Sequence, residues 1–301
     1  MTLLEDRPVT RAPISVPRPP VRRRRQTRRM LAGSVWNLLG VLVGLVMIFP
    51  VYWMLASSFK LGVNLRRVDP QWFPAPFTTD SYRRALEQPR FLGSLLNSLV
   101  VVGSTALIAL VIGFLAALAL ARMNFTGRKA LVILVITIQM VPIEGLIIPM
   151  YLMLNKAHLT DKSIGLILAY LSFVLPFTVW MLRGFIAAVP KDLEEAAMVD
   201  GCTRGQAFRR IILPLAAPGL VATTVFAVIQ AWNEYLFAYV LIKQNTNQTI
   251  TVWLDTFITT KGVDWGALMA ASTLVALPIV VLFAIIQRKV ATGLTAGAVK
   301  G

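Results

Sequence analysis

Two groups of acidic residues in this sequence could do chemistry, and both stand in unusual surroundings. The stretch DLEEAAMVDGCTRGQAFRRIILPL, residues 192–215, places acids and alanines before Gly201 and basic residues after it. Glu144 and Glu234 lie inside long apolar runs. An acid in the hydrocarbon of a membrane costs about 2.5–3.5 kcal/mol on insertion scales, so such residues usually face a cavity or a partner. The first group is suited to binding a partner, and the second to lining a polar pathway.

The residue types that most enzymes need form no recognisable catalytic set. The one histidine, His158, is isolated, and the single Cys202 excludes an intrachain disulfide and a cysteine cluster for a metal or iron–sulfur centre. There is no zinc motif, no G-x-S-x-G sequence and no G-x-x-x-x-G-K-[ST] phosphate loop. We therefore expect no catalytic residue, no metal site and no cofactor in this chain. Any ATP and Mg²⁺ that drive its work should bind to other chains.

The elements that must position the acidic residues are membrane-spanning helices. Of the 301 residues, 56% are hydrophobic and only 15% are charged, which is far more apolar than an ordinary soluble domain. A bilayer core needs about 20 mostly apolar residues per helix. The qualifying stretches are about 34–57, 95–121, 130–153, 164–187, 217–242 and 265–287. The sequence predicts an all-α membrane protein with six transmembrane helices over residues 34–287.

The distribution of charge predicts the orientation of these helices. The net charge is +16, which could suggest nucleic-acid binding, but much of the excess lies in residues 1–33, directly before an apolar run. That arrangement is the positive-inside signal of a cytoplasmic segment, and its prolines predict a disordered tail. Six crossings then place the C-terminal tail, 288–301, in the cytoplasm as well. The arginines of loop 60–93 run against the rule.

The stretch 192–215 lies between the fourth and fifth spans and predicts a short helix outside the membrane. Pro190 suits the first helical position, and the acids that follow favour the positive end of the helix dipole. Gly201 can end the helix by adopting a left-handed conformation. One face is small and shallow, formed by the residues at i, i+3, i+4 and i+7: Leu193, Ala196, Ala197 and Asp200.

A second short helix is predicted directly afterwards. Thr203 with Gln206 three residues later has the pattern of a capping box, and Pro214 is expected to break the helix near the fifth span. An amphipathic connector lying on the membrane is the alternative, but it would need bulky apolar residues opposite basic ones, and acids are poor anchors on anionic headgroups. A protein partner fits the first helix better.

The spacing of this stretch resembles the E-A-A-x3-G-x9-I-x-L-P loop of the permeases of ATP-binding-cassette importers. The matching residues are Glu195, Ala196, Ala197, Gly201, Ile211, Leu213 and Pro214. Asp200, Phe208, Leu215 and Pro218 extend the likeness toward the carbohydrate-importing branch. Trp232-Asn233-Glu234, Asp264-Trp265-Gly266 and the ending GLTAGAVKG (293–301) are similar to the maltose-type second permease of the binding-protein-dependent inner-membrane component family. The likeness covers about residues 34–301.

The resemblance implies the type I importer permease fold in a bacterial plasma (inner) membrane. It also implies a homologous second permease subunit, two cytoplasmic ATPase subunits that bind ATP and Mg²⁺, and an extracytoplasmic sugar-binding protein or lipoprotein. Stretch 192–215 then contains a coupling helix held in a groove of the ATPase. The predicted coupling residues are Glu194, Glu195, Ala196, Ala197, Asp200, Gly201, Phe208, Ile211, Leu213 and Pro214. Contacts with the ATPase by Gly293, Leu294 and Gly297 are also implied, with a frayed terminus as the alternative.

Polar residues within the spans are candidates for a translocation pathway. The predicted set is Glu144, Gln230, Asn233, Glu234 and Tyr235. For Glu234, an interhelical polar contact that fixes packing or the dimer interface is the alternative. Pro142 and Pro149 flank Glu144 and predict a bent third span, so Glu144 is expected to shape a gate rather than to contact a ligand. Asn97 is expected to be structural.

The resemblance further implies a sugar as the transported substrate. We expect a disaccharide such as trehalose or maltose, with another oligosaccharide or a glycerophosphodiester as alternatives. A stand-alone secondary transporter would need a coupling-ion site and usually internal repeats, and only Glu144 and Glu234 support one. A membrane-embedded enzyme lacks a catalytic set. The polar outer segment 243–264 would reach toward the binding protein, or else form a plain solvated connector.

Overall fold

The computed structural model describes residues 23–298, with side chains described from 36 to 287. The chain forms two units, one ending at Tyr52 and the other beginning at Trp53. Helix α1 (Arg23–Ser58) makes up the described part of the first unit and ends in the second. Residues 23–33, expected to be disordered, are therefore helical. The prolines that suggested disorder end at Pro20, and the arginines that follow are good helix formers. Residues 1–22 of the predicted tail lie outside the described residues.

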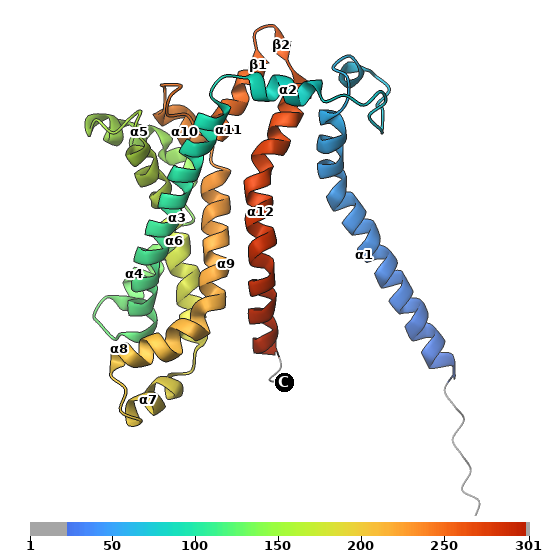
Figure 1. The fold of residues 1–301 in the computed structure, drawn as a ribbon. Helices are drawn as coiled ribbons and strands as arrows, with labels where there is room; N and C mark the ends of the chain where they lie inside the picture. Colours follow the sequence, from blue (N-terminus) through green and yellow to red (C-terminus); the bar gives the residue numbers. More distant parts are fainter. Residues whose placement is uncertain (1–22, 299–301) are drawn as a thin grey trace, which may run out of the picture. The chain divides into compact units, whose positions relative to one another are not determined.

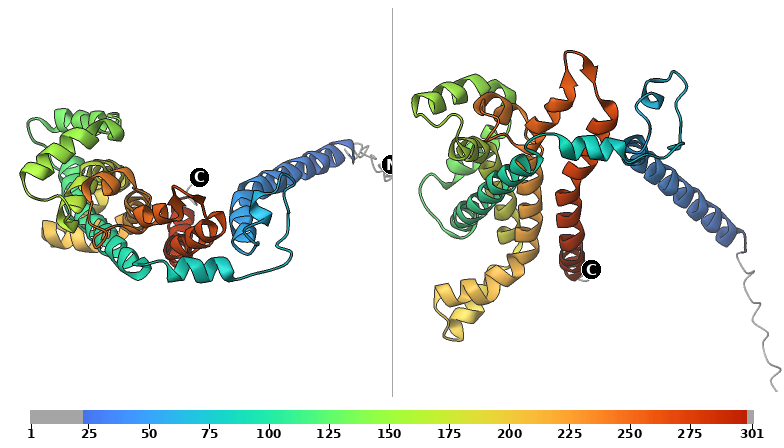
Figure 2. Two further views of the ribbon diagram at one scale, coloured as in Figure 1. Left: turned by 90° about the horizontal axis from the view of Figure 1, so that it is seen from above. Right: turned by 45° about the horizontal axis from the view of Figure 1, so that its top comes forward.

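The second unit is built around three long helices that pack side by side, with a fourth beside them (Figures 1 and 2). These are α3 (Phe91–Arg122), α6 (Ser163–Ala188), α9 (Leu213–Trp232) and α12 (Trp265–Ala298). Small residues allow the close approach. A Cβ on Gly113 would lie 2.7 Å from Cγ2 of Thr178, and one on Gly219 would lie 2.2 Å from Cγ of Phe185. Such contacts are how apolar helices associate where lipid removes the hydrophobic driving force.

Five helices in the described part of the chain are long and apolar enough to cross a membrane, or six if one bent pair of helices counts as a single span. The predicted third span, 130–153, consists of α4 (Arg128–Ile138), the 3₁₀ turn η2 (Ile143–Leu146) and α5 (Ile147–Lys156), bent by 96°. Pro142 precedes the second half, and proline disfavours helical geometry in the residue before it. The bend that the prolines predict is therefore present, and it is sharper than a kink in one helix.

The predicted fifth span, 217–242, is also interrupted. Helix α9 ends at Trp232, residues 233–235 are not helical, and the short α10 (Leu236–Leu241) follows. At its other end, the expectation that Pro214 breaks the helix is wrong. A π-helical turn, η3 (Phe208–Ile212), joins α8 (Arg204–Ala207) to α9 without a gap. Pro214 lies in the first turn of α9, where its missing N–H is tolerated.

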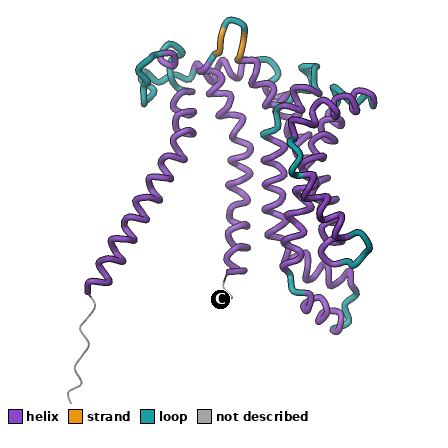
Figure 3. The backbone as a smooth tube through the Cα atoms, turned by 180° about the vertical axis from the view of Figure 1, so that it is seen from behind, coloured by secondary structure: helices purple, strands orange, loops and turns teal. Residues whose placement is uncertain are grey.

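Short elements cluster at the two ends of the second unit. One end carries α2 (Asp80–Glu87), η1 (Asn64–Arg66), α11 (Ile250–Trp253), η4 (Leu254–Phe257) and a two-stranded hairpin, and the other carries α7 (Lys191–Val199) with α8 (Figures 1 and 3). In the hairpin, β1 (Ile258–Thr259) pairs antiparallel with β2 (Gly262–Val263). Helix α12 continues to Ala298, so Gly293, Leu294 and Gly297 have helical backbone, whereas their side chains lie outside the described residues.

Candidate coupling helix and polar helix break

Helix α7 ends in a turn that is held by backbone hydrogen bonds between residues close together in the sequence. Gly201 adopts φ 88°, in the left-handed region. Its N–H donates to the carbonyl of Met198 at 3.1 Å, and the N–H of Cys202 donates to the carbonyl of Ala197 at 2.9 Å. This pair of bonds is the Schellman motif, which satisfies the last carbonyls of a helix. Nothing lies within 4 Å of a Cβ built on Gly201, so the backbone conformation alone calls for glycine there.

The start of the following segment is fixed by the predicted capping box. The N–H of Thr203 donates to Oε1 of Gln206 at 2.8 Å, and the N–H of Gln206 donates to Oγ1 of Thr203 at 3.3 Å. Pro190 is the residue before the first helical position of α7 rather than the first itself. Local rules of capping therefore define both ends of the turn that joins α7 to α8.

Most of the surface of α7 is exposed, and it carries both apolar side chains and acids. None of the nine residues of α7, all of them described, is buried. Leu193 is 43% exposed and Val199 is 86% exposed. Glu195 and Ala196 are exposed between them, and Asp200 follows at the C-cap. Ala197 is half-buried, so the shallow face expected from the spacing is only partly turned outward. An exposed apolar patch with polar neighbours is typical of a protein-binding surface.

The opposite face of α7 is attached to the long helices. Nε of Arg122 lies 2.5 Å from Oε1 of Glu194, and the two side chains are only 10% and 19% exposed. Nη2 of Arg122 also donates to the carbonyl of Val189 at 2.7 Å. One guanidinium thus joins the end of α3, the end of α6 and α7. Glu194, predicted to contact a partner, is directed at its own chain instead.

The π-helical turn beyond α8 is held by packing. The ring centroids of Phe208 and Phe114 are 5.7 Å apart. Ile212, which is 3% exposed, belongs to a cluster with Leu182 and Ile186 of α6. Ile211 is half-buried, while Leu213 and Pro214 are exposed. Phe208 therefore anchors this segment to α3 from within the chain, and Ile212, absent from the predicted set, is the more deeply buried of the two isoleucines.

Glu234 occupies the break between α9 and α10, where it binds backbone. Its carboxylate accepts the N–H of Phe237 at 2.7 Å and the N–H of Ala238 at 3.2 Å. Its carbonyl accepts the hydroxyl of Tyr170 at 3.4 Å and that of Thr251 at 3.0 Å. The side chain satisfies the first N–H groups of α10, and the backbone joins α6 and α11. The carboxylate thus caps the start of α10 locally, whereas the contacts with other helices come from the backbone carbonyl of Glu234.

The other predicted pathway residues differ in their surroundings. Tyr235 donates its hydroxyl to Oδ2 of Asp255 at 2.5 Å. Asn233 is exposed, and Oε1 of Gln230 is buried without a hydrogen-bond partner among the described residues. A buried polar atom left unpaired needs an explanation, and a polar cargo or a partner subunit would supply one. Glu144 is exposed in η2, within the separate break of the third span.

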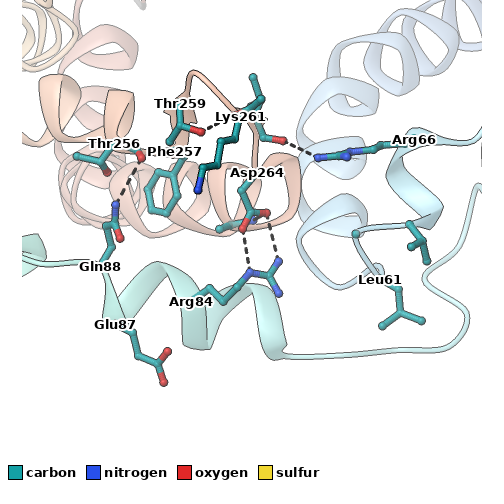
Figure 4. A pocket seen from close by; sticks show the side chains of 15 residues that line it. Leu61, Arg66, Arg84, Glu87, Gln88, Thr256, Phe257, Thr259, Lys261 and Asp264 are labelled. Atoms are coloured by element: carbon teal, nitrogen blue, oxygen red, sulfur yellow. Dashed lines mark hydrogen bonds and ion pairs between the residues drawn. The ribbon is translucent and has the colours of Figure 1, made fainter.

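The Asp264-Trp265-Gly266 sequence has a structural explanation at the opposite end of the unit. Asp264 caps α12, because the N–H of Ala267 donates to its Oδ1 at 3.1 Å. Arg84 of α2 donates to both carboxylate oxygens, at 2.9 and 3.2 Å (Figure 4). Burial alone would raise the pKa of Asp264, but the hydrogen bonds from Arg84 and Ala267 lower it below its ordinary value of 3.8. A Cβ on Gly266 would lie 2.6 Å from Oγ of Ser81.

The middle of the outer segment 243–264 is packed, whereas residues 243–246 and 258–262 are exposed. Ile250 and Trp253 are at most 1% exposed, and the indole N–H of Trp253 donates to the carbonyl of Pro89 at 2.9 Å. Asn97, expected to be structural, donates to the carbonyl of Thr246 at 2.9 Å and so holds this segment to α3. The alternative of a plain solvated connector does not describe the buried middle of the segment, 249–253.

A cavity of about 870 Å³ opens beside the hairpin (Figure 4). Its polar lining includes Arg66, whose guanidinium donates to the carbonyl of Val263 at 3.3 Å, together with Glu87 and Lys261. Sequence reasoning did not find this cavity, since its residues come from segments far apart in the chain. Within the described part of the chain, no three His, Cys, Asp or Glu residues gather as a metal site would require.

Comparison with known proteins identifies the family of this arrangement. Residues 109–295 match the family model of the binding-protein-dependent transport system inner membrane component. The diacetylchitobiose uptake system permease protein DasC of Streptomyces coelicolor is 46% identical over 275 residues, which are 91% of this chain and 100% of that protein. The trehalose transport system permease protein SugB of Mycobacterium tuberculosis is 37% identical over 89% of this chain and 98% of that protein.

The fold is likewise that of a known transporter class. A chain of a bacterial ABC transporter involved in the import of the acidic polysaccharide alginate superposes with a TM-score of 0.71 at 20% identity, over 87% of this chain and 97% of that chain. The chain is thus a multi-pass inner-membrane component of a transporter and not itself an enzyme. It belongs to the family of binding-protein-dependent transport system inner membrane components.

Proposed function

We propose that this chain is a membrane subunit of an ATP-driven importer that carries a disaccharide into the cell. Relatives that match most of the chain are named for diacetylchitobiose at 46% identity, trehalose at 37% and trehalose/maltose at 33%. All three sugars are disaccharides. The higher identity of the first supports a disaccharide of N-acetylated amino sugars ahead of the trehalose or maltose expected from the sequence.

Calorimetry with the cognate binding protein tests the choice of sugar, because the binding protein selects the cargo that the membrane subunits receive. We expect diacetylchitobiose to bind at least about tenfold more tightly than trehalose or maltose, which corresponds to about 1.4 kcal/mol. Equal or tighter binding of trehalose would instead support trehalose, which the sequence predicts, as the transported sugar. A monosaccharide or a glycerophosphodiester as the best ligand would overturn the disaccharide assignment.

The proposed assembly contains this chain, a homologous second permease, two ATPase subunits and an extracytoplasmic binding protein or lipoprotein. The family is binding-protein-dependent, and the sequence lacks a phosphate-binding loop, so ATP and Mg²⁺ would bind to the ATPase subunits. Both termini and α7 would face the cytoplasm, in agreement with the positive-inside rule. The sugar would pass between the two permeases as they rock between inward- and outward-facing states.

Helix α7 is the part of this chain proposed to bind the ATPase. The observation that carries the proposal is its division into two faces. Leu193, Glu195 and Val199 are exposed, whereas Glu194 is fixed to α3 by Arg122. An ATPase that binds the exposed residues of α7 can therefore move α3 through the ion pair between Glu194 and Arg122. Cations on the ATPase would pair with Glu195, as the resemblance implies.

Disulfide crosslinking tests this docking directly. Cys202 is the chain's one cysteine, so a Cys202→Ser background allows single cysteines to be introduced without ambiguity. Ala196→Cys should crosslink to cysteines placed in the groove of the ATPase, and the yield should change when ATP is added. Lys156→Cys, exposed at the end of α5, is the matched control and should give no crosslink. Equal yields at the two positions would contradict the docking.

A further inference from the structure

A second cavity lies where α3, α4 and α6 meet, at the turn between α3 and α4. Its volume is about 910 Å³, and its lining contains three basic residues, Arg128, Lys129 and Arg183. Among the described residues that line it, none is acidic. Three like charges around one cavity repel each other, and an anion placed between them would offset that repulsion.

The hydrogen bonds of these cations leave capacity for a ligand. Arg128 is partly engaged, because its Nε donates to the carbonyl of Leu120 at 2.8 Å and its Nη1 donates to Oδ1 of Asn124 at 3.1 Å. Nε of Arg183 is buried without a partner among the described residues, and its guanidinium carbon lies 5.8 Å from the ring centroid of Trp180. Lys129 is exposed.

The start of α4 adds to the positive potential. Arg128 and Lys129 are the first two residues of this helix, and no side chain caps it. Basic residues at a helix N-terminus are unfavourable in isolation, since the helix dipole is positive there. The same N–H groups and the same dipole bind anions well. The cluster of basic residues and their position at the helix N-terminus both cost free energy without a ligand. Both would therefore stabilise a bound phosphate.

One wall of the cavity is apolar and continues along α4. Val132 and Ile133 line the cavity, and Ile133 is 63% exposed. No residue of α4, which is described throughout, is buried, although every residue from Ala130 to Ile136 is apolar. Because α4 belongs to a bent helix pair that forms either a broken span or a re-entrant loop, we place this apolar wall against hydrocarbon and the basic residues at the level of the headgroups. A free phosphate would leave it uncovered.

We propose that this cavity binds an anionic phospholipid, with the headgroup phosphate on Arg128, Lys129 and Arg183 and an acyl chain along Val132 and Ile133 of α4. Basic pockets at the ends of membrane helices recognise headgroups in this way. The turn between α3 and α4, which lines the cavity, is at the same end of the unit as α7 (Figure 1). The lipid would belong to the leaflet next to the ATPase if the proposed orientation holds, but its binding does not depend on the transport function.

Native mass spectrometry of the assembled transporter tests the site. The complex would be purified in detergent and incubated with phosphatidylglycerol, with phosphatidylcholine, or with inorganic phosphate. Since each basic residue near a headgroup contributes about 1 kcal/mol, Lys129→Gln should weaken phosphatidylglycerol retention about fivefold and Lys129→Gln with Arg183→Gln about 25-fold. Lys156→Gln removes the same charge at the far end of α5 and should change nothing.

Comparing the three ligands distinguishes binding of a lipid headgroup from binding of free phosphate. Retention of phosphatidylglycerol over phosphatidylcholine, lost in step with the two substitutions, supports the proposal. Equal retention in all variants would overturn it, as would tight binding of inorganic phosphate that suppresses lipid binding completely. Lipid bound to this chain alone but excluded from the assembled complex would show that the second permease covers the site, which also contradicts it. Lys129→Gln, at an exposed position, keeps the test valid if the Arg183 variant misfolds.

Discussion

Removing the ion pair between Glu194 and Arg122 should uncouple the transporter without preventing its assembly. Exposed pairs contribute about 0.2–1 kcal/mol, and removing one partner of a fully buried pair costs about 3–5 kcal/mol. With a 2.5 Å separation and side chains 10% and 19% exposed, this pair falls between those limits. We therefore expect a coupling energy of about 2 kcal/mol, which is an equilibrium factor of about 30.

A double-mutant cycle measures that coupling energy. Glu194→Ala, Arg122→Met and the double variant are compared by thermal unfolding of the complete complex. Arg122→Met also removes the bond to the carbonyl of Val189, but that loss occurs on both sides of the cycle and cancels. Asp192→Ala, exposed in the same turn of α7, controls for the loss of an acid near the helix N-terminus.

The functional assay compares sugar uptake with ATP hydrolysis in proteoliposomes. If Glu194 transmits the movement of α7 to α3, Glu194→Ala should lower the sugar carried per ATP while hydrolysis continues. The charge swap, Glu194→Arg with Arg122→Glu, should restore part of it. A coupling energy indistinguishable from zero, or normal uptake by a correctly assembled Glu194→Ala complex, would refute the reasoning.

Three further substitutions give separate tests. Gly201→Ala should destabilise the α7 turn by about 1–2 kcal/mol through its left-handed φ of 88°, whereas Gly201→Asn should cost less; equal melting temperatures would contradict this. Because the pKa of Asp264 is lowered in the folded state, its carboxylate stabilises the fold at pH values above the ordinary pKa of 3.8. That stabilisation is lost as the pH falls from 3.8 through the lowered pKa. Asp264→Asn should therefore reduce the dependence of stability on pH in the acid range, in unfolding measured from pH 3 to pH 7. Glu234→Gln should keep uptake if the residue caps α10, and abolished uptake in a folded protein would favour a pathway role.

The local features of segment 192–215 were accessible from sequence, because each depends on residues a few positions apart. The left-handed glycine at 201 and the capping box of Thr203 and Gln206 follow from short-range hydrogen bonds. The bend near Glu144 follows from flanking prolines. Such features need no knowledge of how the helices pack.

Features that depend on packing could not be predicted. Arg122 and Arg84 find Glu194 and Asp264 only when distant helices are brought together. The break after Trp232 was missed because hydropathy stays high through α10. The signal was present in Glu234 before an apolar run, since its carboxylate accepts the backbone N–H groups of Phe237 and Ala238. Composition alone could not show that the carboxylate of Glu234 accepts two backbone N–H groups at the start of α10.

The measurement that tests the central claim most directly is disaccharide uptake into proteoliposomes of defined composition. A sugar permease of this family should move sugar only when the second permease, the ATPase subunits, the binding protein and ATP are all present. We predict no uptake by this chain alone under any ion gradient. Sugar accumulation by this chain alone would contradict the account, since it would make the protein a stand-alone transporter driven through Glu144 or Glu234.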